Sequence, residues 1–270
     1  MKNDVIVSFV NNPLKIEQLP GGQNTSILAG NVVIKPINEQ EKYCWLAEEF
    51  ENIYSNKLLI AKPITNNKKC YLYKGYGATN YINSHFYRNR LKQKIKAAEE
   101  FHRIVNKIKK PKQFNTWISP WSEATKIAWQ EVDLPKTNNV AVNSILENII
   151  DDYTIVKLDN QFIHSDLAGN ILFQYYKPVI IDISPEFRPI EYAHTLLITD
   201  SIAWHGSSIE SLNLLKYEDN FKRQMILRAV MFRLCVPLCF DKENIIGFMH
   251  EYEDFKPILV KIGIRDLILC

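Results

Sequence analysis

The segment FIHSDLAGNILF (162–173) places a histidine, an aspartate and an asparagine in a short loop between apolar runs. A further apolar run, PVIIDIS (178–184), follows and contains Asp182 near its end. Short apolar runs separated by polar loops predict a strand–loop–strand hairpin over 162–184. A carboxylate beside an apolar strand is costly unless it is paired or metal-bound, so these polar residues need one shared explanation.

The chemistry of these side chains points to phosphoryl transfer. Asp166 can accept a hydroxyl proton and orient the oxygen toward phosphorus. Asn170 and Asp182, on the two arms of the hairpin, can offer oxygen ligands to Mg²⁺ from both sides. For His164 we expect hydrogen bonds to the loop backbone rather than a part in the reaction.

A glycine-containing hairpin near the start of the chain supplies a second element. In LPGGQNTSILAG (19–30) the glycines allow backbone N–H groups to approach an anion closely. The candidate nucleotide-binding residues in this turn are Gly21, Gly22, Gln23, Thr25 and Ser26. Lys35, in the strand that leaves the hairpin, can reach polyphosphate oxygens. Glu39 is the preferred carboxylate to orient this lysine, and Glu41 and Glu49 remain alternatives.

The pattern of elements changes near residues 82–84. Up to residue 82 it reads β-β-α-β-β-β, with a hairpin over 14–37, a helix over 38–54 capped by Asn38, and a strand at the N-terminal MKNDVIVSFV. The rest is mainly helical, with expected helices over 84–108 (capped by Ser84), 119–132 and 142–156 and mostly helical signals over 189–270. We therefore expect an α+β chain with a β-rich lobe at 1–82 and a helical lobe at 83–270.

In this order the motifs resemble those of the aminoglycoside phosphotransferase/choline kinase-like superfamily, which has the protein kinase-like fold. HSDLAGNILF resembles its H-G-D-L-x-x-x-N-[IV]-L motif, VIIDIS its metal motif, and GGQNTSILAGNVVIKP its nucleotide loop and strand lysine. The pattern is also similar to an uncharacterised bacterial phosphotransferase-like subgroup. The resemblance implies a bilobal fold, with ATP (or GTP) and Mg²⁺ between the lobes and the adenine at the connector, near Tyr81 and Ile82.

The chain departs from the usual pattern at the loop. Three residues separate Asp166 from Asn170 where most such kinases have four, which removes up to about 3.5 Å of reach. Ser165 replaces the glycine that precedes the catalytic aspartate, and no glycine follows in the D-I-S segment.

Three functions are compatible with these motifs. The first is an ATP- and Mg²⁺-dependent phosphotransferase acting on a hydroxyl of a small molecule, with Asp166 as the catalytic residue and Asn170 and Asp182 as metal ligands. The second is a nucleotide-binding pseudokinase without turnover, which the short loop favours. The third is a kinase-like enzyme that phosphorylates or nucleotidylates a protein, with the basic helix 88–112 docking an acidic partner.

Composition narrows the class of partner. The formal net charge is +3, and the basic surplus lies on one helix without interleaved aromatic platforms on which bases could stack, so we expect no nucleic-acid partner. No apolar run reaches the 18–20 residues of a membrane helix, so we expect no membrane partner. Five cysteines without a CxxC pair or a secretory leader indicate reduced thiols in the cytoplasm. We interpret His102 as a core histidine, and Asp200 and Trp204 as structural.

Overall fold

A computed structural model describes residues 3–11, 13, 15–19 and 25–264. Its β-rich part is built on an antiparallel six-stranded sheet of order β1-β2-β3-β7-β5, with β6 also paired to β7. The strands are β1 (Ile16–Gln18), β2 (Ile27–Ala29), β3 (Val32–Pro36), β5 (Pro63–Ile64), β6 (Leu72–Tyr73) and β7 (Tyr76–Asn80). The hairpin expected over 14–37 is confirmed by the pairing of β1 with β2 and of β2 with β3. Gly30, at φ +61°, makes the tight turn between β2 and β3.

The N-terminal segment is the helix α1 (Asn3–Phe9), so the strand expected there is wrong. Its β-branched residues favour a strand locally, but Val5 and Ile6 are buried against Ala29, Val32 and Ile34 of the sheet. Packing onto the sheet therefore overrides the local propensity. Asp4 in the first turn suits the positive end of the helix dipole.

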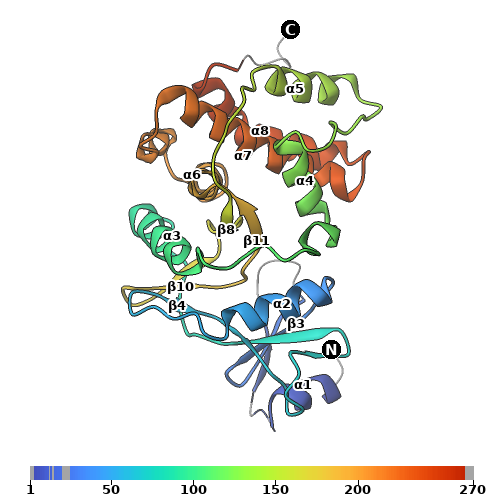
Figure 1. Ribbon diagram of the computed structural model, residues 1–270, viewed down its shortest axis with the longest axis vertical. Helices are drawn as coiled ribbons and strands as arrows, with labels where there is room; N and C mark the ends of the chain where they lie inside the picture. Colours follow the sequence, from blue (N-terminus) through green and yellow to red (C-terminus); the bar gives the residue numbers. More distant parts are fainter. Residues whose placement is uncertain (1–2, 12, 14, 20–24, 265–270) are drawn as a thin grey trace.

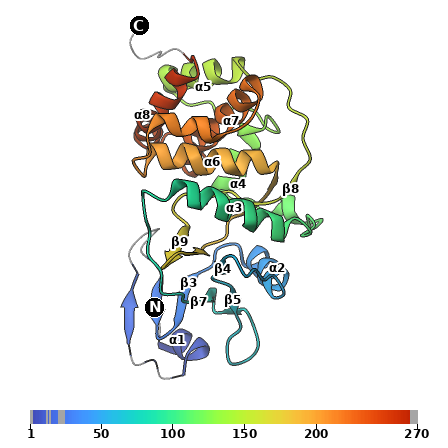
Figure 2. The ribbon, with the colours of Figure 1, turned by 90° about the vertical axis from the view of Figure 1, so that its left-hand side faces the viewer.

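Helix α2 (Gln40–Phe50) joins the sheet to the helical part. It is shorter than the expected 38–54, and Glu39 rather than Asn38 occupies the N-cap position. Tyr43 faces the sheet and donates a hydrogen bond to the carbonyl of Ala78 (2.9 Å). Leu46 and Phe50 instead belong to the large core of the helical part. One helix therefore buries side chains in both halves of the molecule. Its ribbon lies on the side of β3 that faces the helical part (Figures 1 and 2).

The motif region forms two small sheets between the six-stranded sheet and the helices (Figure 1). Their strands are β4 (Leu59–Ile60), β8 (Gln161–His164), β9 (Ile171–Gln174), β10 (Lys177–Ile180) and β11 (Pro185–Arg188). β9 and β10 form an antiparallel hairpin, and β4 adds to β10 in parallel. The hairpin expected over 162–184 is confirmed only for these two strands, because β8 does not pair with β9. β8 pairs with β11, a strand that the sequence reading did not anticipate.

The helical part is organised around α7, whose residues are buried along most of its length. Its helices are α3 (Leu91–Val105), α4 (Pro120–Ala128), α5 (Val140–Asp151), α6 (Ile190–Ala203), α7 (Asp219–Phe240) and α8 (Ile245–Lys261), with 3₁₀ turns at Phe114–Thr116 and Ile209–Leu214. α4, α6 and α8 pack against α7. The helical signal expected after residue 189 is confirmed within the described residues.

Helix α3 begins seven residues later than the expected Ser84 cap, and Arg90 occupies its N-cap position. The backbone of His85 forms a bridge with Phe173 of β9, with N–O distances of 3.0 and 2.9 Å. This pairing holds residue 85 in an extended conformation, so the helix cannot start there. The Ser84 hydroxyl donates to the Ile82 carbonyl instead.

Gly77 allows α2 to approach the strand that pairs with Lys35. A Cβ added at Gly77 would lie 2.5–2.8 Å from ring atoms of Tyr43, well inside van der Waals contact. We therefore expect Gly77→Ala to lower the free energy of unfolding by about 1–3 kcal/mol, measured by urea denaturation. The same substitution in a Tyr43→Leu background should cost clearly less. An equal cost in both backgrounds would contradict the clash.

Candidate active site

The loop between β8 and β9, residues 165–170 (the motif loop), is organised around the buried imidazole of His164. Its Nδ1 accepts hydrogen bonds from the backbone N–H groups of Asp166 (3.1 Å) and Ser184 (3.4 Å). Since Nδ1 accepts, the ring proton is on Nε2, which donates to the carbonyl of Ile181 (3.2 Å). Burial lowers the pKa of His164, so the ring is neutral. This agrees with the backbone role expected from the sequence.

Asn170 turns its amide nitrogen toward Asp166. Nδ2 donates to the Asp166 carbonyl (2.7 Å) and to its Oδ2 (3.0 Å). Within the described part of the chain, no hydrogen bond is made by Asn170 Oδ1. The short loop therefore still presents a neutral side-chain oxygen opposite its inward-facing nitrogen.

Asp182 lies next to Asn170 across the open end of the β9–β10 hairpin. The backbone N–H of Ile181 donates to the Asn170 carbonyl (3.0 Å), which sets the two residues side by side. Asp182 has φ +45°, in the left-handed region that non-glycine residues seldom adopt. Backbone strain of this kind is found preferentially at functional sites. The Asp182 carboxylate remains 57% exposed.

Lys35 reaches this hairpin from the six-stranded sheet. Its ammonium forms an ion pair and hydrogen bond with Asp182, 147 residues away in the sequence. The structure therefore brings together three residues from the sequence prediction, Lys35, Asp182 and Asn170. Asp166 joins them through the hydrogen bonds of Asn170.

The carboxylate expected beside Lys35 has other partners. Glu39 lies 3.4 Å from Lys42 Nζ, and its Oε1 is buried without a hydrogen bond among the described residues. Glu41 accepts a hydrogen bond from the Trp117 indole (3.2 Å), which attaches α2 to the helical part. Lys35 pairs with Asp182, so the assignment of Glu39 to Lys35 stays a prediction.

The nucleotide-binding candidates are placed only in part. Gly21, Gly22 and Gln23 lie outside the described residues. Thr25 and Ser26 directly precede β2. Tyr81 follows β7 and donates its N–H to the Asn31 carbonyl (2.9 Å), and Ile82 is half-buried in the connector that leads to α3. Thr25 and Ser26 therefore lie at the end of the sheet near Lys35 and Pro36, and Tyr81 and Ile82 lie at the opposite end, near the β2–β3 turn.

Two charged side chains at the motif loop were not anticipated. Arg233 of α7 donates to Asp166 Oδ1 (2.9 Å) and is itself held by Asp200 of α6. Burial opposes ionisation of Asp166, but Arg233, His164 and the hydrogen bond from Asn170 together outweigh it and hold the pKa of Asp166 below its ordinary value. Burial raises the pKa of Asp200 to about 6. The available signal was a charged residue inside each of two apolar helices, since such residues need partners.

Lys94 of α3 is the second unanticipated side chain. It is 1% exposed, and its ammonium donates to the Ala168 carbonyl at the centre of the motif loop (2.8 Å). The ammonium also lies 3.8 Å from the centroid of the Phe86 ring. Burial lowers the pKa of Lys94 to about 8. This hydrogen bond connects helix α3 to the backbone of the motif loop.

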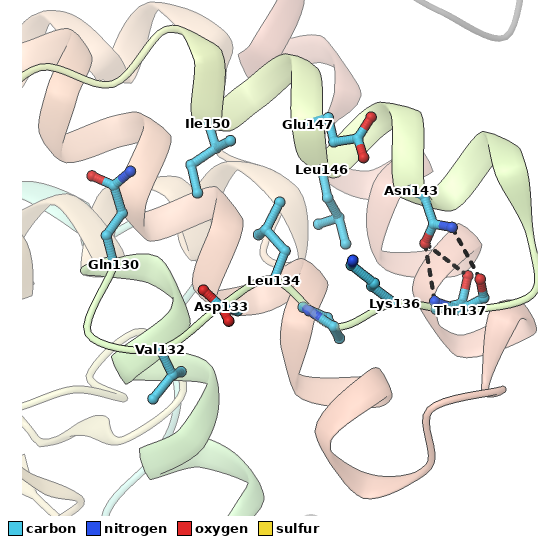
Figure 3. A pocket seen from close by; sticks show the side chains of 11 residues that line it. Gln130, Val132, Asp133, Leu134, Lys136, Thr137, Asn143, Leu146, Glu147 and Ile150 are labelled. Carbon is cyan, nitrogen blue, oxygen red and sulfur yellow. Dashed lines mark hydrogen bonds between the residues drawn. The ribbon is translucent and has the colours of Figure 1, made fainter.

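One hollow in the helical part lies away from these residues. A pocket of about 740 Å³ is lined by the α4–α5 connection and by α5, including Gln130, Leu134, Lys136 and Ile150 (Figure 3). Thr137 and Asn143 fix its rim through reciprocal hydrogen bonds of 2.9–3.1 Å. The candidate catalytic groups come from the motif loop and the β9–β10 hairpin, so this pocket is not the candidate active site.

Comparison with solved structures identifies the architecture. Choline kinase LicA from Streptococcus pneumoniae has a TM-score of 0.55 at 15% identity, with 95% of this chain and 96% of that chain covered. Aminoglycoside phosphotransferase APH(4)-Ia, in a ternary complex with AMP-PNP and hygromycin B, has a TM-score of 0.62 at 13% identity, covering 96% and 97%. An aminoglycoside phosphotransferase from Alicyclobacillus acidocaldarius has a TM-score of 0.58 at 11% identity, with 97% of this chain and 95% of that chain covered.

The chain has the protein kinase-like fold. The α+β, protein kinase-like architecture expected from the motifs is thereby confirmed over nearly the whole length. No protein-family profile and no curated protein sequence matches the chain. Among the described residues, no helix is both long and apolar enough to cross a bilayer.

The depressed pKa of Lys94 predicts a pH dependence of stability. The folded pKa of about 8 lies below the ordinary 10.5, so the charged form is disfavoured by folding. The resulting loss of unfolding free energy is fully present below pH 8 and disappears as the pH rises toward 10.5. Between pH 7.5 and 10, wild type should gain about 2 kcal/mol of unfolding free energy relative to Lys94→Met, measured by urea denaturation.

The matched control is Lys96→Met, on the exposed face of the same helix. Its unfolding free energy should follow that of wild type across this pH range. If the Lys94 and Lys96 variants show the same pH dependence, the buried ammonium at Lys94 is not the titrating group.

Proposed function

We propose that this protein is an ATP- and Mg²⁺-dependent phosphotransferase that phosphorylates a hydroxyl group of a small molecule. The observation that carries the proposal is the meeting of Lys35, from the sheet, with Asp182 beside Asn170 and Asp166. These are the cation, the metal-ligand oxygens and the acceptor-orienting carboxylate that phosphoryl transfer requires. The fold is shared with kinases whose structures contain AMP-PNP, ADP or AMP.

The donor set fits a hard divalent cation. Asp182 offers a carboxylate that is 57% exposed, and Asn170 offers an amide oxygen without a hydrogen bond among the described residues. Mg²⁺ prefers a few protein oxygens and keeps the rest of its shell for water and phosphate. When bound, Mg²⁺ would neutralise charge on the β- and γ-phosphates.

The chain's own residues would divide the remaining work. Lys35 is 30% exposed and can exchange its carboxylate partner for phosphate oxygens. Asp166, whose side chain is 44% exposed, faces the acceptor and orients its hydroxyl. Its pKa is held below the ordinary value, so the carboxylate is ionised at neutral pH and can accept that hydrogen bond. Tyr81 and Ile82 offer backbone groups to the adenine, and the turn containing Thr25 and Ser26 covers the phosphates.

Asp166→Asn should lower the release of labelled phosphate from γ-labelled ATP in the presence of Mg²⁺ by about 10²-fold or more. Nucleotide binding, measured by calorimetry, should be unchanged, because Asp166 contacts the acceptor. Asp182→Asn should instead weaken Mg²⁺-dependent nucleotide binding, and chelation of Mg²⁺ should abolish release. Asp159→Asn, at an exposed position, serves as the control and should retain wild-type rates.

Three outcomes would count against the proposal. Tight nucleotide binding without any release or transfer would favour a regulatory protein without turnover. Autophosphorylation or nucleotidylation detected by intact mass would favour a protein-modifying enzyme. Failure to bind ATP with Mg²⁺ would remove the basis for all of these functions.

A further inference from the structure

The Asp166 carboxylate is held by a residue from outside the sequence motif. Arg233 lies 67 positions later, on α7, and its Nη2 donates to Asp166 Oδ1 (2.9 Å). The Arg233 side chain is only 8% exposed. Burying a guanidinium without a partner carries a large cost in free energy, so the position of Arg233 depends on the carboxylates that pair with it.

Asp200 fixes the guanidinium from the opposite side. It is completely buried on α6 and accepts two hydrogen bonds from Arg233, from Nε (3.1 Å) and from Nη2 (2.5 Å). The guanidinium carbon also lies 4.8 Å from the ring centroids of Trp204 and Phe232. Carboxylate and aromatic contacts together leave Arg233 one orientation.

The two oxygens of Asp166 are therefore divided between two donors. Oδ1 is bonded by Arg233 and Oδ2 by Asn170 (3.0 Å), from opposite ends of the carboxylate. An aspartate carboxylate otherwise rotates in a broad, shallow χ2 profile. With both oxygens held, its plane is fixed while the side chain stays 44% exposed toward the acceptor side.

We propose that Arg233, held by Asp200, is a positioning residue that sets the orientation in which Asp166 receives the acceptor hydroxyl. The inference rests on the proposed phosphotransfer function but concerns residues outside its motifs. Arg233 acts through Asp166 and needs no contact with nucleotide or acceptor. Helices α6 and α7, which carry Asp200 and Arg233, pack against each other. Their packing therefore fixes the orientation of Asp166.

The structural part of the inference can be tested without turnover. Crystal structures of wild type, Arg233→Met and Asp200→Asn should show Asp166 in one conformer in wild type and rotated or split in both variants. Asp166 in the wild-type conformer in Arg233→Met would overturn the proposal. Arg233→Lys keeps the charge and provides a second variant if the methionine variant does not fold.

The kinetic part uses water as acceptor, with Mg²⁺–ATP as the only substrate. Arg233→Met should lower kcat for phosphate release by about 10²-fold, the cost of a small misplacement of a catalytic group, while KM for ATP changes less than about twofold. Arg233→Lys should recover part of the loss, and Asp200→Asn should show a similar kcat defect.

Arg228→Met is the matched control for a purely structural effect. Arg228 is on the same helix, is 4% exposed, and donates to Gln224 and to the Thr154 carbonyl rather than to Asp166. Its variant should lose stability yet keep the wild-type kcat per folded molecule. Equal kcat losses for the Arg228 and Arg233 variants would overturn the inference. Wild type without phosphate release, together with a displaced Asp166 in Arg233→Met, would instead reject the proposed activity and leave the positioning role intact.

Discussion

The buried imidazole of His164 is the interaction on which the rest of the site depends. It accepts from the backbone at Asp166 and Ser184 and donates to Ile181, so it joins two segments that the motif reading treats separately. The ring must be neutral to do this, and its complete burial ensures that it is. A second histidine continues the arrangement, because His102 Nε2 accepts the backbone N–H of His164 (3.2 Å). The backbone that carries the candidate metal ligands Asn170 and Asp182 is therefore held in place by an uncharged ring.

Sequence patterns predicted correctly those strands and turns whose conformation depends mainly on their own residues. The hairpin at Gly30 and the apolar strands of the motif region follow from turn chemistry and short apolar runs. The sequence predictions were wrong where packing against a distant part of the chain decides the local conformation. Val5 and Ile6 become helical because the sheet offers them a surface, and the bridge from His85 to Phe173 delays the start of α3. Neither partner can be known before the chain is folded.

The same division applies to the candidate site. Asp166, Asn170 and Asp182 could be found from sequence because all three lie within one short segment of apolar runs and polar loops. Lys35 could be found, but its partner could not, since Asp182 reaches it across 147 residues. Asp200 was interpreted as structural, and its burial agrees with that. Its link to Asp166 through Arg233 depends on the packing of two helices, which no local pattern encodes.

The short strand β4 limits how the two halves can move. Leu59 and Ile60 come from the chain that leads into β5 of the large sheet, yet they pair with Val179 and Ile180 of the hairpin that carries Asp182. The Ala61 N–H extends this seam by donating to the Ile180 carbonyl (2.9 Å). Main-chain hydrogen bonds thereby connect the two halves at this seam. Translation of one half away from the other would break main-chain hydrogen bonds directly behind the metal-ligand candidates.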